Sequence, residues 1–426
     1  IASNTNNLAK KEDLLALQRL QEEFAAELAT LRGRVDALEA RTSELEANQF
    51  STTTKLSGHV GTYIGDAFGK NADPENNSTF SYQFNLNFLT SFTGKDSLVI
   101  ALKAANNQPF NTATDYPSGR LSGATNETRL TFPTRLTDGQ ITLSFLQYSF
   151  PVGDKLRVYL NAFSSNGILS APITTLGSSS RGYVSLYGRI VALSAPVNLQ
   201  SGIGVKWDIF PWLSLDVKAG SESGAPNNPG IGLFNGGNAI SLRPVINLGR
   251  LRMTAFYVHS YSPEFGIATL VGSNAAKVIG AGPVVANSYT GAMFYRVTPN
   301  IEVGGSVSYA TARTLGSGTR GDARVWDYNI NFTFYDLGKK GNVGGILLGM
   351  QPRLASTSNG NLAEAIGLPS GQRSDRNAGL HVETFYAHRI GDRITITPAF
   401  IWLTAPNHDQ RNPDVFIGVI RTTFDF

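Results

Sequence analysis

The first fifty residues carry apolar positions that recur every 3.5 residues, the period of a coiled-coil helix. Residues 11–48 contain a single glycine, Gly33, and no proline. With heptad position a placed at Leu14, eight of the ten a and d positions are apolar. Three g residues, Glu27, Arg34 and Arg41, each find an opposite charge at the e position five residues later, at Arg32, Glu39 and Glu46. The pattern predicts a parallel, in-register bundle, because g and e charges pair between neighbouring parallel helices.

The segment from Arg34 to Glu39 matches a motif that is typical of trimeric coiled coils, in which Arg at g reaches Glu at e. We therefore expect residues 11–49 to form a trimeric stalk, preceded by a linker at residues 1–10. Its predicted contacts are Leu14, Leu17, Phe24, Leu28, Leu31, Arg34, Val35, Leu38, Glu39 and Leu45. The alternative is one amphipathic helix that lies on its own domain.

After residue 50 the period changes from 3.5 to 2 and stays there to the C-terminus. In residues 82–88 and 328–334 every apolar side chain alternates with an uncharged polar one. Many segments of about ten residues repeat this pattern, with aromatic and aliphatic side chains on one face and Asn, Ser, Thr, Gly and scattered charge on the other. This alternation is typical of a transmembrane β-barrel with lipid outside and water inside. We therefore predict an all-β barrel over residues 50–426.

Tight turns separate the predicted strands and allow them to be counted. Seven turns are expected, at 93–96, 153–154, 211–212, 249–250, 299–300, 338–342 and 391–392. Seven hairpins plus a first strand at about 53–68 and a last strand at about 414–426 give sixteen strands, with both ends in the periplasm. The opposite connections are long, at 107–139, 164–199, 222–237, 261–284 and 354–377. Strand-like pieces at 128–132 and 182–193 leave eighteen strands as an alternative.

Composition agrees with a barrel in a membrane. Charged residues make up 16% of the chain, against ~25% in average soluble proteins. No run approaches the ~20 apolar residues that a membrane-spanning helix needs, so a helical membrane protein is excluded. The absence of cysteine excludes a disulfide scaffold and a thiolate metal site. The chain ends in Phe426 on an alternating strand, which resembles the sorting signal of bacterial outer-membrane proteins.

The strand phase places nine basic and six acidic side chains toward the lumen. The basic side chains are Lys55, Lys103, Arg157, Lys206, Lys218, Arg243, Arg252, Arg393 and Arg421, and the acidic ones are Asp208, Asp216, Glu302, Asp327, Glu383 and Asp425. Residues 51–426 carry a net charge of +7, whereas the whole chain carries +4, so the stalk is acidic and the barrel basic. Because basic lumen residues lower the entry barrier for anions, we predict a weakly anion-preferring or poorly selective channel.

Long loops that follow early strands often fold inward and narrow a channel of this size. The candidate constriction residues are Arg120, Arg129, Arg135, Arg181 and Arg189. An enzyme is the competing class, but none of the five histidines lies in a hydrolase or metalloprotease motif. His381 and Glu383 share the inward phase of one strand, where they bind a metal or simply line water. We expect no enzyme activity, no cofactor and no nucleic-acid partner.

The junction between helix and barrel, from Leu20 through Thr42 and on to Leu56, resembles the cyanobacterial outer-membrane porins. Those proteins join an S-layer-homology domain, a coiled coil and a porin barrel, are related to the carbohydrate-selective porins, and are often labelled iron uptake porins. The resemblance implies a homotrimer in the outer membrane, a periplasmic stalk, passage of small inorganic ions, and attachment to a peptidoglycan-linked polymer. Nothing before Lys10 resembles the S-layer-homology domain, and no secretory signal is visible, so we expect a mature or trimmed chain without its own wall-binding residues.

The sequence therefore predicts a trimeric porin that passes small hydrophilic solutes and inorganic ions, including iron species, by passive diffusion. The alternative is an envelope tether that links outer membrane to peptidoglycan through a largely closed barrel. Measured conductance separates the two functions, because a plugged anchor carries no current.

Overall fold

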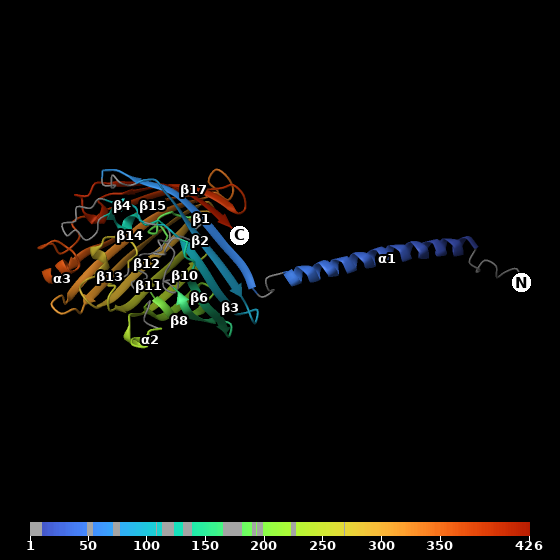
Figure 1. The fold of residues 1–426 in the computed structure, drawn as a ribbon, viewed down its shortest axis with the longest axis horizontal. Coiled ribbons are helices and arrows are strands. Elements are labelled where there is room, and N and C mark those ends of the chain that lie inside the picture. Colours follow the sequence, from blue (N-terminus) through green and yellow to red (C-terminus); the bar gives the residue numbers. More distant parts are fainter. Residues whose placement is uncertain are drawn as a thin grey trace. The chain divides into compact units, whose positions relative to one another are not determined.

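The structure is a computed structural model of a chain that forms a helix and a closed β-barrel (Figure 1). It describes residues 11–48, 54–70, 77–107, 109–112, 123–130, 139–164, 181–189, 193, 199–222, 227–267 and 269–426. Two compact units divide the chain, residues 1–55 and residues 56–426.

The N-terminal helix α1 spans Lys11–Asn48 and contains 38 residues. Its heptad leucines are exposed in the single chain, for example Leu17 at 68% and Leu28 at 64%. The side chain of Leu45 lies outside the described residues. None of the helices that the structure describes has the length and apolarity needed to cross a membrane.

Sixteen antiparallel strands close into one ring, which confirms the predicted fold class. In ring order these are β1 (Thr54–Phe68), β18 (Val415–Asp425), β17 (Ile394–Leu403), β16 (His381–Arg389), β15 (Val343–Thr357), β14 (Gly321–Tyr335), β13 (Ile301–Thr314), β12 (Val284–Thr298), β11 (Leu251–Ser262), β10 (Asn238–Leu248), β9 (Leu213–Glu222), β8 (Leu199–Phe210), β7 (Leu156–Ser164), β6 (Thr142–Val152), β3 (Ser97–Ala105) and β2 (Thr79–Thr90). The ring closes where β1 pairs with β18, from His59 opposite Asp425 to Phe68 opposite Phe416.

All seven predicted tight turns join consecutive strands of the ring. Pro211 and Trp212 connect β8 to β9, and Gly249 and Arg250 connect β10 to β11. A positive φ of 63° at Gly249 explains why glycine stands in that two-residue turn. The opposite end of the barrel carries the long connections, and we call it the long-loop end.

The alternative of eighteen strands is wrong for the described residues. Residues 126–128 form the short helix η2, and Leu130 makes only an isolated bridge to Ser185, so neither strand-like piece joins the ring. The two-residue strands β4 (Asn111–Thr112) and β5 (Gly123–Ala124) form a separate small sheet. Alternation alone did not distinguish a wall strand from an extended segment inside the barrel.

Strand β14 shows how the two faces of the wall differ. Its residues Trp326, Tyr328 and Ile330 point outward and are 42%, 42% and 50% exposed. The alternating Asp327, Asn329, Asn331 and Thr333 are at most 3% exposed. Polar side chains therefore face the interior and apolar side chains face outward, the arrangement expected for a wall between lipid and an aqueous lumen.

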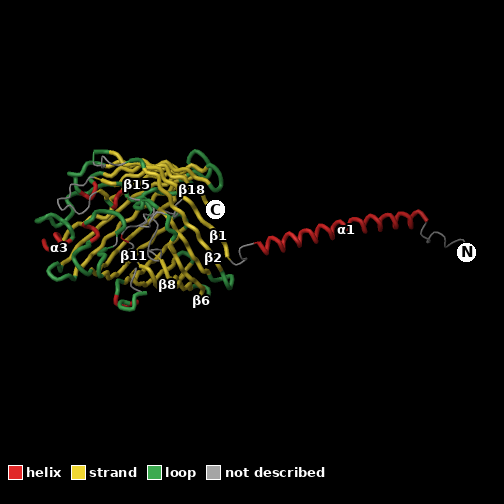
Figure 2. The backbone as a smooth tube through the Cα atoms, in the orientation of Figure 1, coloured by secondary structure: helices red, strands yellow, loops and turns green. Residues whose placement is uncertain are grey.

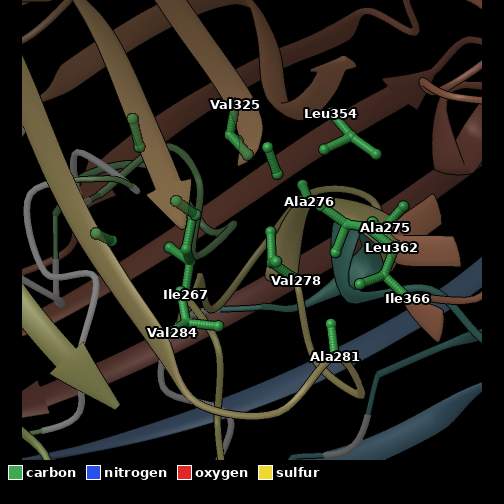
Figure 3. Close-up of a cluster of buried hydrophobic side chains, with 14 of the residues drawn as sticks. Ile267, Ala275, Ala276, Val278, Ala281, Val284, Val325, Leu354, Leu362 and Ile366 are labelled. Carbon is green, nitrogen blue, oxygen red and sulfur yellow. The ribbon is translucent and has the colours of Figure 1, made fainter. Parts of the chain in front are cut away.

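The long-loop end also has an apolar core, which is built from connections and not from wall strands alone. Figure 3 shows Ile267, Ala275 and Val278 of the β11–β12 connection against Val325 and Leu354 of the wall. This connection contains the short helix η4 (Ala275–Lys277). Among the described residues, the other short helices are α2 (Gly232–Asn235), α3 (Gly360–Ala365) and η5 (Pro406–His408). The loops at this end therefore fold over the lumen and pack as a core.

Candidate functional site

Two segments of the long connections pack against inward-facing side chains of the ring, and Figure 2 shows chain that crosses the interior of the ring. We call residues 123–130 the first inner segment and residues 181–189 the second inner segment. They belong to the β3–β6 and β7–β8 connections, the two that the sequence predicts to fold inward. The amide of Leu186 donates to the carbonyl of Arg129 at 2.9 Å, so the two segments contact each other.

Glu383 on β16 is the main anchor of the second inner segment. One carboxylate oxygen, Oε1, accepts hydrogen bonds from the amides of Val184 at 2.6 Å and Ser185 at 3.1 Å. The other, Oε2, accepts from the Ser185 hydroxyl. Charge-assisted bonds of this kind are about twice as strong as neutral ones. Gly188 has no room for a side chain, because an added Cβ lies 2.5 Å from Cβ of Tyr183 and 2.8 Å from Oε2 of Glu383.

Arg421 and two tyrosines complete the anchor of the second inner segment. The guanidinium of Arg421, on β18, donates to the carbonyls of Gly182 at 2.6 Å and Tyr183 at 3.2 Å. The Tyr183 hydroxyl donates to the carbonyl of Ile346 at 3.0 Å, and the Tyr187 hydroxyl donates to that of Tyr328 at 2.6 Å. Burial forces these polar groups to find partners, so the segment is fixed to the wall along several strands.

A buried hydrogen-bonded chain joins the two inner segments through the wall. Gln351 on β15 donates to the carbonyl of Glu127 at 3.2 Å and lies 2.9 Å from Nδ1 of His381. Its side-chain oxygen accepts from the amide of Gly272 at 3.0 Å, so the amide nitrogen is the group facing His381. Nδ1 is then the acceptor, and Nε2 of His381 donates to Glu383 at 3.3 Å. The first and second inner segments thus share one polar network.

A second polar cluster holds the first inner segment at the long-loop end. The carboxylate of Glu127 accepts from the amide of Asn407 at 2.5 Å and lies 4.0 Å from Nε2 of His408. Burial raises the pKa of Glu127 to about 7, and the nearby Asp375 adds to the rise while the Asn407 bond opposes it. Burial also raises the pKa of Asp375 to about 7.

His408 is neutral in this cluster. Nδ1 accepts from the amide of Gly379 at 2.8 Å, and Nε2 donates to the carbonyl of Gln351 at 3.0 Å. Burial lowers the pKa of His408 to about 4, and the positive charge of Arg353 adds to the decrease. The 4.0 Å contact with Glu127 is therefore not an ion pair near neutral pH.

Fourteen of the fifteen predicted lumen charges lie on the inward phase of strands, whereas Arg393 lies in the turn between β16 and β17. The fifteen side chains also differ in burial. The side chains that keep accessible surface are Lys55, Lys103, Arg157, Lys206, Asp208, Lys218, Arg243, Arg252, Arg393 and Asp425. The buried ones are Asp216, Glu302, Asp327, Glu383 and Arg421. Eight of the ten accessible charges are basic, whereas four of the five buried charges are acidic.

Four of these residues form one row across neighbouring strands. Arg157 lies opposite Lys206, Lys206 opposite Asp216, and Asp216 opposite Arg243. Arg243 pairs with Asp216 at 2.6 Å, and Lys206 pairs with Asp208 at 2.9 Å. This row lies on β7–β10, away from the strands that hold the second inner segment.

The predicted constriction arginines do not all lie in the described inner segments. Arg129 and Arg189 belong to the inner segments, and Arg129 donates to the carbonyl of Leu270 at 3.1 Å. Arg181 begins the second inner segment and is half-buried. Arg120 and Arg135 lie outside the described residues.

Sequence reasoning missed the partners that anchor the inner segments. Glu127, Gln351 and Ser185 carry no motif, and their partners are up to 280 residues away in the chain. The closeness of His381 and Glu383 on one strand was the only available signal, and it suggested a metal or water. Among the described residues, no group of three or more His, Cys, Asp or Glu side chains is arranged to hold a metal ion.

Replacing Glu383 should loosen the second inner segment. Glu383→Gln removes the charge from bonds that contribute ~1.5–3 kcal/mol each, so amide exchange at Val184 and Ser185 should accelerate roughly ten- to hundredfold. Hydrogen exchange followed by mass spectrometry on the folded barrel measures this change. Asp216→Asn is the matched control, because it removes a buried charge from β9 that bonds to Arg243 and not to the segment. Unchanged exchange in Glu383→Gln would show that Glu383 is not the anchor.

Docking of the first inner segment should weaken as pH rises. Because burial raises the pKa of Glu127 to about 7, its contribution to docking is complete below the ordinary carboxyl pKa of ~4.3 and is lost as pH rises through about 7. Asp375 acts in the same direction, whereas His408 opposes docking only as pH falls below ~6.5 toward 4.

Hydrogen exchange of residues 123–130, corrected for intrinsic rates, should therefore be faster at pH 8.5 than at pH ~6. Glu127→Gln should reduce this difference, because it removes one of the two titrating carboxyls. Glu364→Gln, an exposed change on α3, should leave the difference as it is. If the exchange of residues 123–130 had the same pH dependence in the wild-type protein, Glu127→Gln and Glu364→Gln, then Glu127 would not be a group whose titration controls docking.

Comparison with known proteins agrees with this architecture. The family model described as carbohydrate-selective porin, OprB family, matches residues 11–426. An uncharacterized protein of the cyanobacterium Nostoc sp. is 36% identical over all of this chain and 74% of its own length. An uncharacterized protein of Synechocystis sp. is 29% identical over 97% of this chain and 76% of its own length.

The solved structures show the same fold at low sequence identity. OprB of Pseudomonas putida has a TM-score of 0.63 and 11% identity, covering 90% of this chain and 96% of its own. The anion-selective porin of Comamonas acidovorans has a TM-score of 0.50 and 11% identity, covering 88% of this chain and 99% of its own. With its sixteen-stranded barrel and a family match over nearly its whole length, the chain belongs to the OprB family of carbohydrate-selective porins, which are outer-membrane diffusion channels and not enzymes.

Proposed function

We propose that this porin passes small hydrophilic solutes and inorganic ions, iron species among them, with a preference for anions. The proposal rests on a difference in burial: the basic lumen side chains are mostly accessible, and the acidic ones are mostly buried. Of the predicted lumen charges that lie on strands, seven of the nine accessible ones are basic, and most of the acidic ones are buried in the wall. A passing ion therefore meets mainly Lys and Arg, which lower the electrostatic barrier for anions.

The second inner segment explains how one acidic side chain, Glu383, becomes inaccessible. Glu383 and Arg421 are both fully buried beneath the second inner segment, so we assign them to holding that segment. Asp216 is only 5% exposed and pairs with Arg243. The basic side chains on β7–β9, in particular Arg157, Lys206 and Lys218, keep accessible surface and are our candidates for solute contact.

A second function, an envelope tether with a largely closed barrel, has one observation in its favour. The described inner segments and the apolar core of the β11–β12 connection occupy space inside the ring against β13–β18. The tether would also need attachment to a peptidoglycan-linked polymer, as in porins with an S-layer-homology domain. A closed barrel and a porin differ in whether they carry current.

Planar-bilayer recording tests the channel proposal. The purified protein should conduct, and its reversal potential in a KCl gradient should have the sign of chloride preference, because the accessible lumen is basic. Replacing Arg157 and Lys218 together by Glu should shift the reversal potential toward cations. The double change Lys339→Glu and Lys340→Glu is the matched control, since it makes the same charge change in an exposed turn outside the lumen.

The outcomes distinguish the two functions. Strong cation preference of the wild-type protein would overturn the anion proposal while leaving a channel. Electrical silence of a correctly folded protein would overturn the channel and favour the tether.

We further propose that α1 assembles three chains in the periplasm. The apolar a and d side chains that the structure describes are 49–68% exposed in the single chain, for example Phe24 at 56% and Val35 at 49%, which is costly in water unless partner helices cover them. Arg34 and Glu39 stand where adjacent parallel helices pair charges.

A charge in the heptad core should weaken the assembly. Leu28→Asp places a carboxylate at an a position and should lower the temperature at which the oligomer separates into single chains in SDS. Ala29→Asp, one residue later and outside the a and d positions, is the control and should separate near the wild-type temperature. Native mass spectrometry of the wild-type protein in mild detergent should give three chains. A single chain there would contradict the trimer.

A further inference from the structure

The outer face of β10–β14 carries a hollow that the channel function does not use. Its cavity volume is about 970 Å³, and a second hollow of about 470 Å³ shares Pro244, Ala255, Gly291 and Val307 with it. We call the two together the outer groove. Binding pockets for small ligands in proteins have volumes of ~300–1,000 Å³, so the outer groove has the size of a binding site.

Small side chains at outward positions create the outer groove. Ala255 lies opposite Gly291, and Gly291 lies opposite Val307 on the next strand. A Cβ added to Gly291 meets no atom within 4 Å, so open space stands above this residue. Outward neighbours on the same strand are large, with Tyr289 at 50% and Met293 at 54% exposure. The wall therefore has a local depression between side chains that project from it.

The outer groove is long and apolar. On β12 its lining runs from Gly291 to Val297, six residue steps or ~20 Å along the strand. Met293, Tyr295 and Ile330 are among its walls, and all point away from the lumen. An elongated apolar depression on a lipid-facing wall has the shape of an extended hydrocarbon chain.

A row of aromatic side chains borders the outer groove toward the long-loop end. Tyr257, Tyr289, Tyr309 and Trp326 are successive cross-strand neighbours on β11–β14. The ring centroids of Tyr257 and Tyr289 are 5.3 Å apart, and those of Tyr309 and Trp326 are 4.7 Å apart. Aromatic rows of this kind mark the level of the lipid headgroups.

Polar side chains follow one register step beyond the aromatic row. Oδ1 of Asn287 accepts from the Tyr257 hydroxyl at 2.9 Å and lies 2.9 Å from Nδ1 of His259. In the same row Arg324 is exposed, and the structure records no ion pair or hydrogen bond for its side chain among the described residues. A guanidinium at headgroup level matches a phosphate, with which it forms two parallel hydrogen bonds.

The outer groove lies across the ring from β1, the strand that follows α1 in the chain. Strand β11 lies eight strands from β1 in both directions around the ring. Only five residues separate the end of α1 from β1, so β1 is the strand tethered to any helix bundle. The outer groove is thus on the strands that are farthest from that tether along the ring.

We propose that the outer groove binds one acyl chain of a lipid with an anionic phosphate headgroup, and that Arg324 contacts the phosphate. The hydrocarbon chain lies over Gly291 and Ala255, while the headgroup lies beyond the aromatic row. The proposal concerns the outer wall and is independent of what the lumen passes.

The test measures lipid retained by the purified full-length protein after detergent exchange, using native mass spectrometry. The probes are phosphatidylglycerol and an uncharged galactolipid with the same acyl chains. The wild-type protein should retain phosphatidylglycerol about tenfold better than the galactolipid. Gly291→Leu fills the outer groove and should lower retention of both lipids about tenfold, and Ala255→Leu should act in the same direction. Arg324→Gln should remove the difference between the two lipids.

The control variant is Thr384→Leu, which adds an apolar side chain at an exposed outward position on β16, outside the outer groove. It should retain lipid as the wild-type protein does. A heat-dependent shift on SDS gels verifies that each variant has a folded barrel. Equal retention in the wild-type protein and Gly291→Leu would overturn the acyl site, and equal retention of both lipids by the wild-type protein would overturn the phosphate contact. A change in the number of associated chains in Gly291→Leu would instead make the outer groove an interface between copies.

Discussion

Every backbone amide and carbonyl of a membrane-spanning sheet needs a partner, because the hydrocarbon region offers none, and this constraint underlies the whole structure. The chain meets it by closing sixteen strands into a ring, with β1 paired to β18. Closure fixes which alternate residues face lipid. The outward face excludes charge near the midplane, where a Lys or Arg costs ~2–4 kcal/mol. The charge of the chain is therefore concentrated in the lumen, the loops, the helix and the strand ends at headgroup level, where Arg324 lies.

Several charged side chains on the inward face are buried, and a buried charge is stable only with partners. Glu383 accepts hydrogen bonds from backbone amides of the second inner segment, and Arg421 donates hydrogen bonds to carbonyls of the same segment. The charges that stabilise the inner segments are thereby removed from the surface that solutes meet. In our proposal the remaining accessible charges, mainly basic, set the ion preference. In this proposal, one set of alternating residues supplies both the anchor and the pore lining.

The outer wall also has local exceptions to its regular pattern of alternating side chains. Alternation gives a uniform apolar surface, and Ala255, Gly291 and Gly305 interrupt it with small side chains. The aromatic row lies next to these small residues, and Arg324 lies beyond the row. Along the strands the outer surface therefore changes from apolar to aromatic to cationic. Neither feature affects closure of the barrel, so both are free to serve binding at the lipid face.

The sequence by itself determined the barrel, its seven tight turns and the inward phase of most of the lumen charges. These features depend on period-2 alternation and on turn residues, which are local properties. It left eighteen strands open and missed the partners of Glu383, because an extended segment inside a barrel alternates like a wall strand. Only the tertiary structure decided that residues 181–189 dock on β16 and β18, which lie some 200 residues later in the chain. Burial and long-range hydrogen bonds exist only after the ring has closed, so no local pattern encodes which lumen charges stay accessible.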